Sequence, residues 1–450
     1  LLRALPDYII DQANREGRFN GRIVVVKSTS HGGTDAFSEQ DNLYTVCIKG
    51  YEDGQWVEKN VINTSISRVL AASEEWDKVL EVAESPELEV ILSNTTEVGI
   101  VYEEENVLQG CPRSYPGKLL AVLYRRFQIL GADGGLIVIP TELISDNGEK
   151  LKAIVVKLAD FNGLDQDFKT WLGAEVIFCN SLVDRIVPGS PKGEVGEQIR
   201  KELDYEDELL IMAEPYALWA ISGDQKVKER LSFVGHGAFV EEDITKYKEL
   251  KLRLLNGTHT MTCGLAFFAG FKTVKDAMQV PAFSEFLTRM MEEEIGPSIP
   301  YPLAPGEAEK FGAQVIDRFR NTAIEHFWLN ITLNYTQKIE MRIVALLQQF
   351  QGVPKRMAAG LAAYILFMRP VREEGGKWYG NWQGEDYWIQ DQQAPAFVEL
   401  YSEDVDAWVK AVLGKKEFWG QDLNELPGLS AEVSDNLRKL QSLGAKAVLS

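Results

Sequence analysis

Cysteine and histidine are scarce in this chain of 450 residues, which holds four of each. The cysteines at 47, 111, 179 and 263 lie far apart and form no C-x-x-C pair. This pattern argues against a disulfide framework and against a zinc site, and it favours a reducing compartment. No apolar run reaches the ~18 residues that a transmembrane helix needs, and the opening residues do not resemble a signal peptide. We therefore expect a cytoplasmic protein that uses no metal and enters no membrane.

Positively charged residues are also fewer than negatively charged ones. Lysine and arginine number 47 against 67 aspartates and glutamates, so the formal net charge is −20. An acidic chain repels phosphate backbones and anionic lipid surfaces, which argues against nucleic acid and membrane partners. Hydrophobic residues make up 45% of the chain and charged residues 25%, as in an ordinary globular protein. The length predicts two or three domains.

The first half of the chain alternates β-rich runs with helical stretches. Apolar runs predict strands at 22–27, 43–49, 89–93, 135–140 and 175–179. Helical periodicity predicts helices at 1–14, 67–83, 116–130 and 194–203. Uninterrupted apolar strands are typical of a parallel sheet covered on both faces. The pattern predicts a doubly wound, Rossmann-like α/β domain over 1–238.

After residue 238 helical periodicity dominates. It predicts helices at 244–255, 274–278, 282–294, 307–318, 336–349, 355–368 and 404–413. The stretch 375–391 mixes tryptophan and tyrosine with glycine and polar residues, and we expect an ordered loop there. The second domain, 239–450, is therefore predicted to be mostly α-helical.

A dinucleotide-binding α/β domain normally opens with a strand and a glycine-rich G-x-G-x-x-G turn. This chain contains no such motif and opens on a predicted helix. Two interpretations remain open. Either the domain binds no dinucleotide, or the numbering begins after the first strand and its glycine turn.

The segment 251–259 carries the clearest chemical pattern. At about 100° per helical residue, Lys251, Asn256 and His259 fall within an arc of about 140°. A lysine, an amide and an imidazole can supply a proton donor, an oxyanion donor and an orienting group, which together suit carbonyl reduction without a metal. A solvated lysine and a histidine that is an ordinary core or surface residue are the plainer interpretation of the same spacing.

Two polar segments follow predicted strands, where open α/β sheets bind ligands. The first contains Thr95, Thr96 and Glu97, and the second contains Asp184 and Arg185. Small hydroxyl groups at such a place could contact a ribose or a nicotinamide. An ordinary turn and a local ion pair are the structural alternatives.

Four motifs occur in one order along the chain. They are Thr95-x-Glu97-x-Gly99, Val183-Asp184-Arg185-Ile186, Lys251-x4-Asn256-Gly-x-His259 and Arg318-Phe319-x-Asn321. Together they resemble the mannitol dehydrogenase family of polyol-specific long-chain dehydrogenases. Further segments, among them Gln40–Thr45 and Ser114-Tyr-Pro-x-Lys118-Leu, are similar to its uronate-reducing branch. The resemblance extends from Leu1 to about Asp391.

The resemblance implies an NAD-dependent oxidoreductase that interconverts D-altronate and D-tagaturonate. It implies that Lys251 is the acid–base group, that Asn256 donates to the oxyanion and that His259 orients. It assigns cofactor contacts to Leu1, Leu2, Arg3, Thr95, Thr96, Glu97 and Asp184. Leu1–Arg3 look like the end of the family's glycine turn, so we expect about 20 residues of the family pattern to precede them.

Substrate contacts are implied for Arg185, Asn330 and Lys338. The chain departs from the mannitol type at Leu143, where an oxyanion-donating amide is expected, and at Asn330, where an arginine is expected. Both departures favour a different polyhydroxy substrate, such as a small sugar acid. Lys27, at the end of a predicted strand, could accept a 2′-phosphate and leaves NADP open beside NAD.

Several other functions fit part of the pattern. Fructuronate reduction or mannitol-type oxidation would use the same scaffold. A sensor of sugars or nucleotides could keep the fold, although it would not need a proton donor such as Lys251. The scattered cysteines make a zinc-dependent alcohol dehydrogenase a poor match. The sequence leaves the oligomeric state open.

Overall fold

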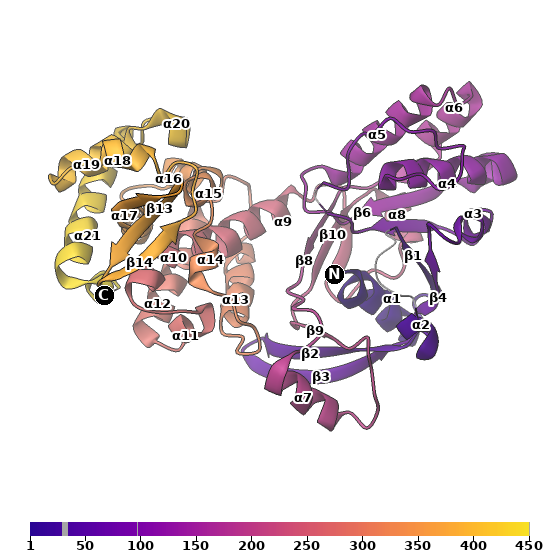
Figure 1. Cartoon of the computed structure of the whole chain (residues 1–450), viewed down its shortest axis with the longest axis horizontal. Coiled ribbons are helices and arrows are strands. Elements are labelled where there is room, and N and C mark those ends of the chain that lie inside the picture. The colour runs from indigo at the N-terminus through magenta and orange to yellow at the C-terminus, as the bar shows by residue number, and fades with distance from the viewer. Residues whose placement is uncertain (29–34, 97, 450) are drawn as a thin grey trace. The chain divides into compact units, whose positions relative to one another are not determined.

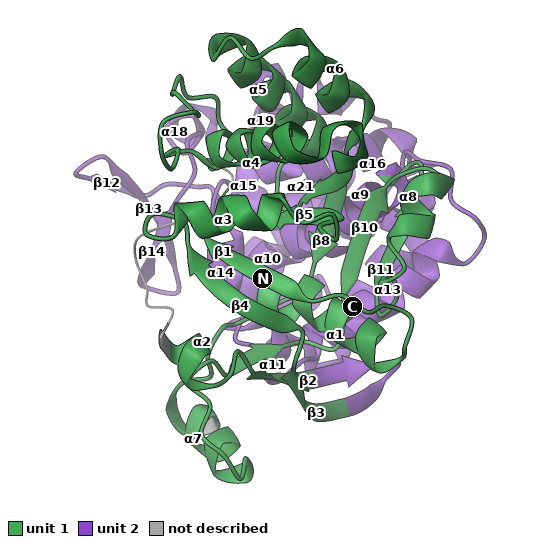
Figure 2. Ribbon diagram, turned by 90° about the vertical axis from the view of Figure 1, so that its right-hand side faces the viewer, with its two compact units in different colours: residues 1–49, 57–244 green, residues 50–56, 245–450 purple. Residues whose placement is uncertain are grey.

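The computed structural model describes residues 1–28, 35–96 and 98–449. The chain divides into two compact units (Figure 2). Unit 1 comprises residues 1–49 and 57–244, and unit 2 comprises residues 50–56 and 245–450. In the described part of the chain, every helix is too short or too polar to cross a bilayer.

Parallel strands form the centre of unit 1 (Figure 1). Strand β1 (Ile23–Lys27) pairs in parallel with β4 (Ile66–Ala71). Strand β6 (Leu136–Pro140) lies between β5 (Val90–Ser93) and β7 (Val176–Phe178), and both neighbours run parallel to it. The carboxyl ends of these three strands therefore meet at one edge of their sheet.

The helices of unit 1 connect or cover these strands. They are α1 (Pro6–Arg15), α2 (Asp35–Glu39), α3 (Trp76–Ala83), α4 (Tyr115–Leu130), α5 (Asn147–Phe161), α6 (Gln166–Ala174), α7 (Gly193–Glu202) and α8 (Gln225–Arg230). Helix α4 has a capped N-terminus, where the Ser114 hydroxyl accepts a hydrogen bond from the amide of Gly117. This cap and the apolar period agree with the helix predicted at 116–130.

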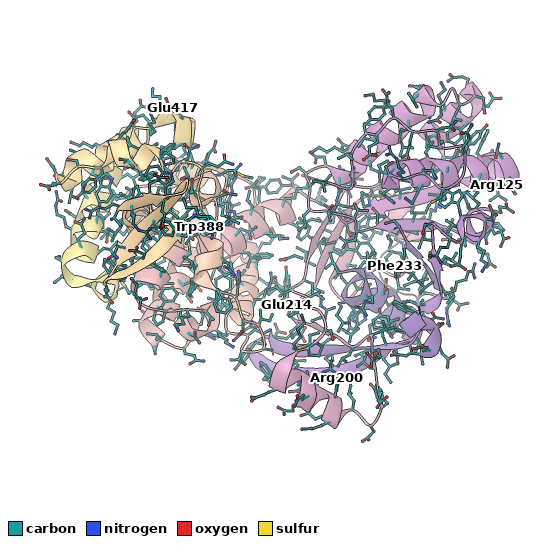
Figure 3. All side chains as sticks on the ribbon, in the orientation of Figure 1. Arg125, Arg200, Glu214, Phe233, Trp388 and Glu417 are labelled. Carbon is teal, nitrogen blue, oxygen red and sulfur yellow. The ribbon has the colours of Figure 1, made fainter. Side chains whose placement is uncertain are left out.

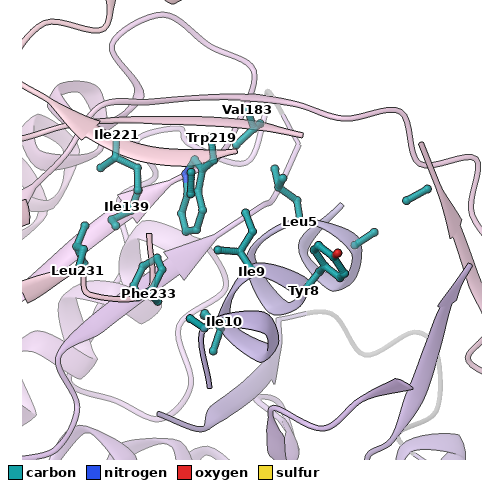
Figure 4. Close-up of a cluster of buried hydrophobic side chains, with 14 of the residues drawn as sticks. Leu5, Tyr8, Ile9, Ile10, Ile139, Val183, Trp219, Ile221, Leu231 and Phe233 are labelled. Carbon is teal, nitrogen blue, oxygen red and sulfur yellow. The ribbon is translucent and has the colours of Figure 1, made fainter. Parts of the chain in front are cut away.

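Strand β6 shows why the central sheet needs apolar residues at every position. All five of its residues are buried. Ile137 and Ile139 join the cluster that contains Ile9 and Trp219 (Figure 4). Leu136 and Val138 join a second cluster formed largely by α4, α5 and α6. Because the strand is covered on both faces, its apolar residues do not alternate with polar ones, which confirms the predicted doubly wound α/β architecture.

Two further three-stranded sheets are formed mainly by residues of unit 1. Their strands are β2 (Tyr44–Glu52), β3 (Gln55–Asn63), β8 (Ser181–Asp184), β9 (Ile211–Ala213), β10 (Leu218–Ser222) and β11 (Ala238–Glu241). One sheet has the order β3-β2-β9 and the other the order β11-β10-β8. Asp53 and Gly54 join β2 to β3 with φ values of 52° and 73°, as a tight hairpin turn requires.

Helices dominate unit 2, as predicted. They are α9 (Thr245–Leu250), α10 (Thr258–Phe268), α11 (Val274–Met278), α12 (Pro281–Arg289), α13 (Glu307–Phe319), α14 (Trp328–Ile331), α15 (Tyr335–Arg342), α16 (Val344–Gln349), α17 (Lys355–Phe367), α18 (Ala396–Leu400), α19 (Val405–Leu413), α20 (Lys416–Trp419) and α21 (Leu429–Leu443). Helix α17 is buried from Met357 onward and packs against α10 and α21, so it forms the centre of this unit.

Two segments differ in kind from the sequence prediction, apart from π-helical stretches within predicted helices. The range 67–83, predicted as one helix, forms the end of β4 followed by α3, because Val69 and Leu70 pair with β1 in the parallel ladder. The range 375–391, predicted as a loop, belongs to an antiparallel sheet of β12 (Arg372–Glu374), β13 (Lys377–Trp382) and β14 (Glu385–Ile389). Its turns contain paired residues with positive φ, a hairpin signal that the aromatic composition obscured.

Candidate functional site

The carboxyl ends of β5 and β6 are joined by Glu142, which is only 3% exposed. Its carboxylate accepts hydrogen bonds from the amide of Thr95 at 2.8 Å and from the hydroxyl of Thr95 at 2.9 Å. It also accepts from the hydroxyl of Ser93 at 3.1 Å. One buried carboxylate thus fixes the start of the polar segment that follows β5.

Asn147 continues this network toward β8. Its side-chain amide donates to the carbonyl oxygens of Pro140, Glu142 and Ser181 at 3.0–3.1 Å, and its oxygen accepts from the amide of Ser181 at 2.9 Å. The next residue must be glycine, since a Cβ on Gly148 would overlap the carbonyl oxygen of Cys179. No functional role was predicted for Glu142 or Asn147 from the sequence. The signal that could have found Glu142 is its place two residues after a fully apolar strand, whereas Asn147 begins α5.

Replacing Glu142 by alanine should lower the free energy of unfolding by about 1–3 kcal/mol, because it leaves the donors of buried Ser93 and half-buried Thr95 without their acceptor. Glu142→Gln should lose less, since the amide keeps one acceptor oxygen. Leu143→Ala is the matched control: the neighbouring leucine is 62% exposed, so its removal should change stability by less than about 0.5 kcal/mol. Denaturant unfolding measures all three. Equal stability of Glu142→Ala and the control would contradict this role.

Three of the predicted cofactor contacts of unit 1, Thr95, Thr96 and Asp184, lie at or near strand ends. Thr95 is half-buried and bonded to Glu142, and Thr96 is exposed. Asp184 is the last residue of β8, where it lies opposite Leu218 of β10. Leu2 and Arg3 begin a short helical turn, and Arg3 donates to the carbonyl oxygen of Leu209 at 2.7 Å. Glu97 lies outside the described residues.

Arg185 is 6% exposed and bonded within unit 1. Its guanidinium donates to the carbonyl oxygens of Glu214 at 2.9 Å and of Ala4 at 2.5 Å, and it lies over the ring of Tyr8. The Glu214 carboxylate in turn accepts from the amide of Ile186 at 2.6 Å (Glu214 is labelled in Figure 3). Arg185 therefore anchors the start of α1. Sequence reasoning alone could not distinguish this from the substrate contact that it predicted.

In unit 2, Lys251 and Asn256 lie on a π-helical segment, η3 (Lys251–Gly257), between α9 and α10. A π-helix closes its hydrogen bonds on the fifth residue along the chain, so Asn256 lies just over one turn from Lys251. Regular α-helical spacing would place the two about 140° apart. The π-helical segment thus brings both side chains to one side of the helix, which corrects the regular spacing assumed from sequence.

His259, in the first turn of α10, is 8% exposed. Its ring stacks on Phe319 at a centroid distance of 4.0 Å, and the rings of His326 and Trp328 meet it edge to face at 4.9 and 5.7 Å. Its Nδ1 is buried and has no hydrogen-bond partner among the described residues. Such an atom in a native structure calls for an explanation, and a bound ligand is one.

Burial holds the pKa of His259 well below its usual value, and the positive groups of Arg318, Arg342 and Lys338 act in the same direction. The imidazole is therefore neutral near pH 7 and offers one donor and one acceptor. The charged side chains that act most strongly on this pKa, those of Arg318, Arg342 and Lys338, are all positive. Among the described residues this is a positively charged environment suited to an anion.

Two arginines hold η3 against α15. Arg253 donates from η3 to the carbonyl oxygens of Met341 and Arg342, both at 2.8 Å. Arg342 donates back to the carbonyl oxygen of Asn256 at 3.3 Å and to the hydroxyl of Thr260 at 3.0 Å. The reciprocal contacts fix the end of the π-helical segment, from which the Asn256 side chain projects. The Asn256 side chain itself makes no hydrogen bond to another described residue.

The two predicted substrate contacts of unit 2 lie close together in the chain. Lys338 is half-buried on α15 and donates to the carbonyl oxygen of Ile331 at 2.9 Å. Burial lowers the pKa of Lys338, and the charge of Arg342 lowers it further. Asn330 is exposed on α14, next to Ile331. Within the described residues, no group of three His, Cys, Asp or Glu side chains could hold a metal ion.

Unit 1 is an α/β unit with polar groups at the carboxyl ends of its parallel strands. Unit 2 is helical and carries a lysine, an amide and a buried neutral imidazole. This combination is typical of two-domain dehydrogenases. Family models agree. The mannitol dehydrogenase Rossmann domain matches residues 1–235, and the mannitol dehydrogenase C-terminal domain matches residues 243–441. The chain belongs to the mannitol dehydrogenase family.

Curated relatives narrow the comparison. The chain is 36% identical to the altronate oxidoreductase of Halalkalibacterium halodurans, with 100% of this chain and 90% of that protein covered. It is 34% identical to the altronate oxidoreductase of Bacillus subtilis, with 100% and 92% covered. These relatives confirm the resemblance to the uronate-reducing branch. The chain is an oxidoreductase of the polyol and sugar-acid dehydrogenase type.

Solved structures share the fold. D-sorbitol dehydrogenase in substrate-free form superposes with a TM-score of 0.77 at 20% identity, covering 100% of this chain and 93% of that one. Mannitol 2-dehydrogenase of Pseudomonas fluorescens, in a ternary complex with NAD and D-mannitol, gives 0.65 at 22% identity and covers 100% and 91%. At these identities the likeness supports the Rossmann-type and helical architecture alone.

Proposed function

We propose that this chain interconverts D-altronate and D-tagaturonate with NAD as cofactor. The observation that carries the acid substrate is the positively charged surrounding of His259 in unit 2, where Arg318, Arg342 and Lys338 act on a buried neutral imidazole. A carboxylate gains from such a surrounding, whereas a neutral polyol does not. The likeness to altronate oxidoreductases supports the same substrate class.

The carboxyl edge of the parallel sheet fits a nicotinamide cofactor, because open α/β sheets bind such ligands there and because hydroxyl and amide groups gather at that edge. Thr95, held by Glu142, and Asp184 would contact it from strand ends. The other described residues of the predicted cofactor site are Leu1, Leu2, Arg3 and Thr96. When bound, the nicotinamide supplies a hydride to the substrate carbonyl carbon in reduction and accepts it in oxidation. Lys27 ends β1 and keeps NADP as the alternative.

In this proposal Lys251 gives a proton to the carbonyl oxygen during reduction and removes it from the hydroxyl during oxidation. Asn256 donates a hydrogen bond to the same oxygen while it carries negative charge, a contact worth about 3 kcal/mol in comparable sites. His259, neutral because it is buried, orients a substrate hydroxyl or Lys251. Lys338 supplies positive charge for the substrate carboxylate.

The test is a substrate panel with purified protein, followed at the absorbance band of reduced nicotinamide. Tagaturonate, fructuronate and the neutral ketose fructose are each offered with NADH and with NADPH. We expect the highest kcat/KM for tagaturonate with NADH. Preference for fructuronate would favour the alternative function on the same scaffold. Equal efficiency with fructose would show that the substrate need not be an acid.

A further inference from the structure

We propose that His326 determines specificity for the sugar acid by donating a hydrogen bond to the substrate's carboxylate. The inference rests on the proposed function, since it concerns the same substrate. No sequence motif singled out this residue, because it lies in the connection between α13 and α14 rather than on a patterned helix.

The backbone of His326 is held firmly although it belongs to a loop. Its carbonyl oxygen accepts from the amide of Val274 at 2.9 Å. The next residue, Phe327, forms an isolated antiparallel bridge with Thr273, and the amide of Trp328 donates to the carbonyl oxygen of Lys272 at 3.1 Å. These contacts tie the loop to the start of α11, so the imidazole is presented from a fixed position.

The side chain of His326 lies at the candidate active site. Its ring meets the ring of His259 edge to face at a centroid distance of 4.9 Å. The residue is half-buried, and neither of its ring nitrogens makes a hydrogen bond to another described residue. A ring so close to His259, with its polar edge unused by the described protein, can bind a group of the substrate.

The charged groups that act on this pair of rings are Arg318 from α13, and Lys338 and Arg342 from α15. Burial lowers the pKa of His326, and Lys338 and Arg318 lower it further. His326 is therefore a neutral hydrogen-bonding group near pH 7, and Lys338 and Arg318 are the nearby charges. The lysine keeps donors beyond the one that it gives to Ile331.

A carboxylate needs both a charge and directed donors to be held in one orientation. Lys338 is a flexible point charge, whereas the imidazole of His326 is planar and fixed by its backbone. The two together distinguish the acid from the alcohol of the same sugar, which has no acceptor pair at that carbon. We therefore expect a change at His326 to weaken binding of the acid and to leave binding of the neutral analogue unchanged.

The test compares His326→Phe, which keeps a ring against His259 but removes the hydrogen bond, with His326→Gln, which keeps a donor. D-altronate and its neutral counterpart D-altritol serve as ligands; altritol is measured as an inhibitor where it is not oxidised. We expect His326→Phe to raise KM for altronate roughly tenfold or more, as loss of a bond to a charged group does, with kcat reduced less. The inhibition constant (or KM) for altritol and the Kd of NADH should stay within about twofold of the wild-type values.

His326→Gln should recover most of the altronate affinity. The matched control is His236→Asn in unit 1, whose imidazole pairs with Glu16 at the surface and whose removal should leave both ligands unaffected. Thermal unfolding of each variant shows whether it folds. If the phenylalanine variant does not fold, the altronate KM of the glutamine variant provides the test.

Two outcomes would overturn the role of His326: an altronate KM within twofold of wild type in His326→Phe, or equal weakening of altronate and altritol. Neither would touch the proposed function, which depends on the wild-type substrate panel. If the wild-type protein instead failed to turn over any hexuronate, the proposed function itself would fail.

Discussion

Replacing Lys251 by alanine should reduce turnover about 10²–10⁴-fold, the usual cost of losing a general acid–base group, while NADH still binds. Lys251 begins the π-helical segment η3, which brings it to the same side as Asn256. Proton transfer and oxyanion stabilisation then act on one substrate oxygen. The NADH affinity should hold because the proposed cofactor contacts lie in unit 1.

Two further variants separate proton transfer from charge. Lys251→Arg keeps a positive charge but cannot give up its proton near neutral pH, so it should be as inactive as Lys251→Ala. Lys310→Ala, at an exposed position of α13, should behave as wild type. Steady-state rates and NADH titration by fluorescence measure these effects. A Lys251→Ala enzyme that kept more than about a tenth of the wild-type rate would exclude this lysine as the acid–base group.

Replacing Lys338 by methionine should raise KM for altronate roughly ten- to a hundredfold, the equivalent of about 1.5–3 kcal/mol for a lost charged hydrogen bond. Methionine keeps an apolar stem of similar length, so the change removes mainly the charge. Because the charge of Lys338 also lowers the pKa of His259 and His326, the variant should let both imidazoles protonate at a higher pH than in wild type.

The measurement compares the KM for altronate with the KM for NADH in each variant. Lys338→Arg should recover part of the altronate affinity, and the KM for NADH should not move in either variant. Thermal unfolding reports the cost of leaving the carbonyl oxygen of Ile331 without its donor. A Lys338→Met enzyme whose altronate KM rose less than threefold would show that another group binds the carboxylate.

Some features of this protein could be predicted from local sequence, because their cause is local. The run Leu136–Pro140 is apolar throughout because the strand is buried on both faces. An uninterrupted apolar run of this kind therefore predicts a fully buried strand. The helix 116–130 has its capping serine and its apolar period within a few residues. The order of Lys251, Asn256 and His259 indicated the chemistry and, with the other motifs, the family.

Other features depend on residues that meet only in the folded chain. Thr95 and Glu142 lie 47 positions apart in the sequence. Nothing near either residue shows that the carboxylate of Glu142 holds the loop that contains Thr95. The interior contacts of Arg185 come likewise from Ala4 and Glu214, distant in sequence. A motif can therefore name a residue type and still leave open whether it binds substrate or its own protein.

The candidate site of unit 2 shows the same division. The sequence by itself determined which side chains are available, namely a lysine, an amide and an imidazole in one short segment. The tertiary structure decided the rest: α15 holds η3 through Arg342, and the loop after α13 brings His326 to His259. The physical reason is that helical periodicity is a property of neighbouring residues, whereas burial, and with it the neutral state of His259, arises only when distant elements pack together.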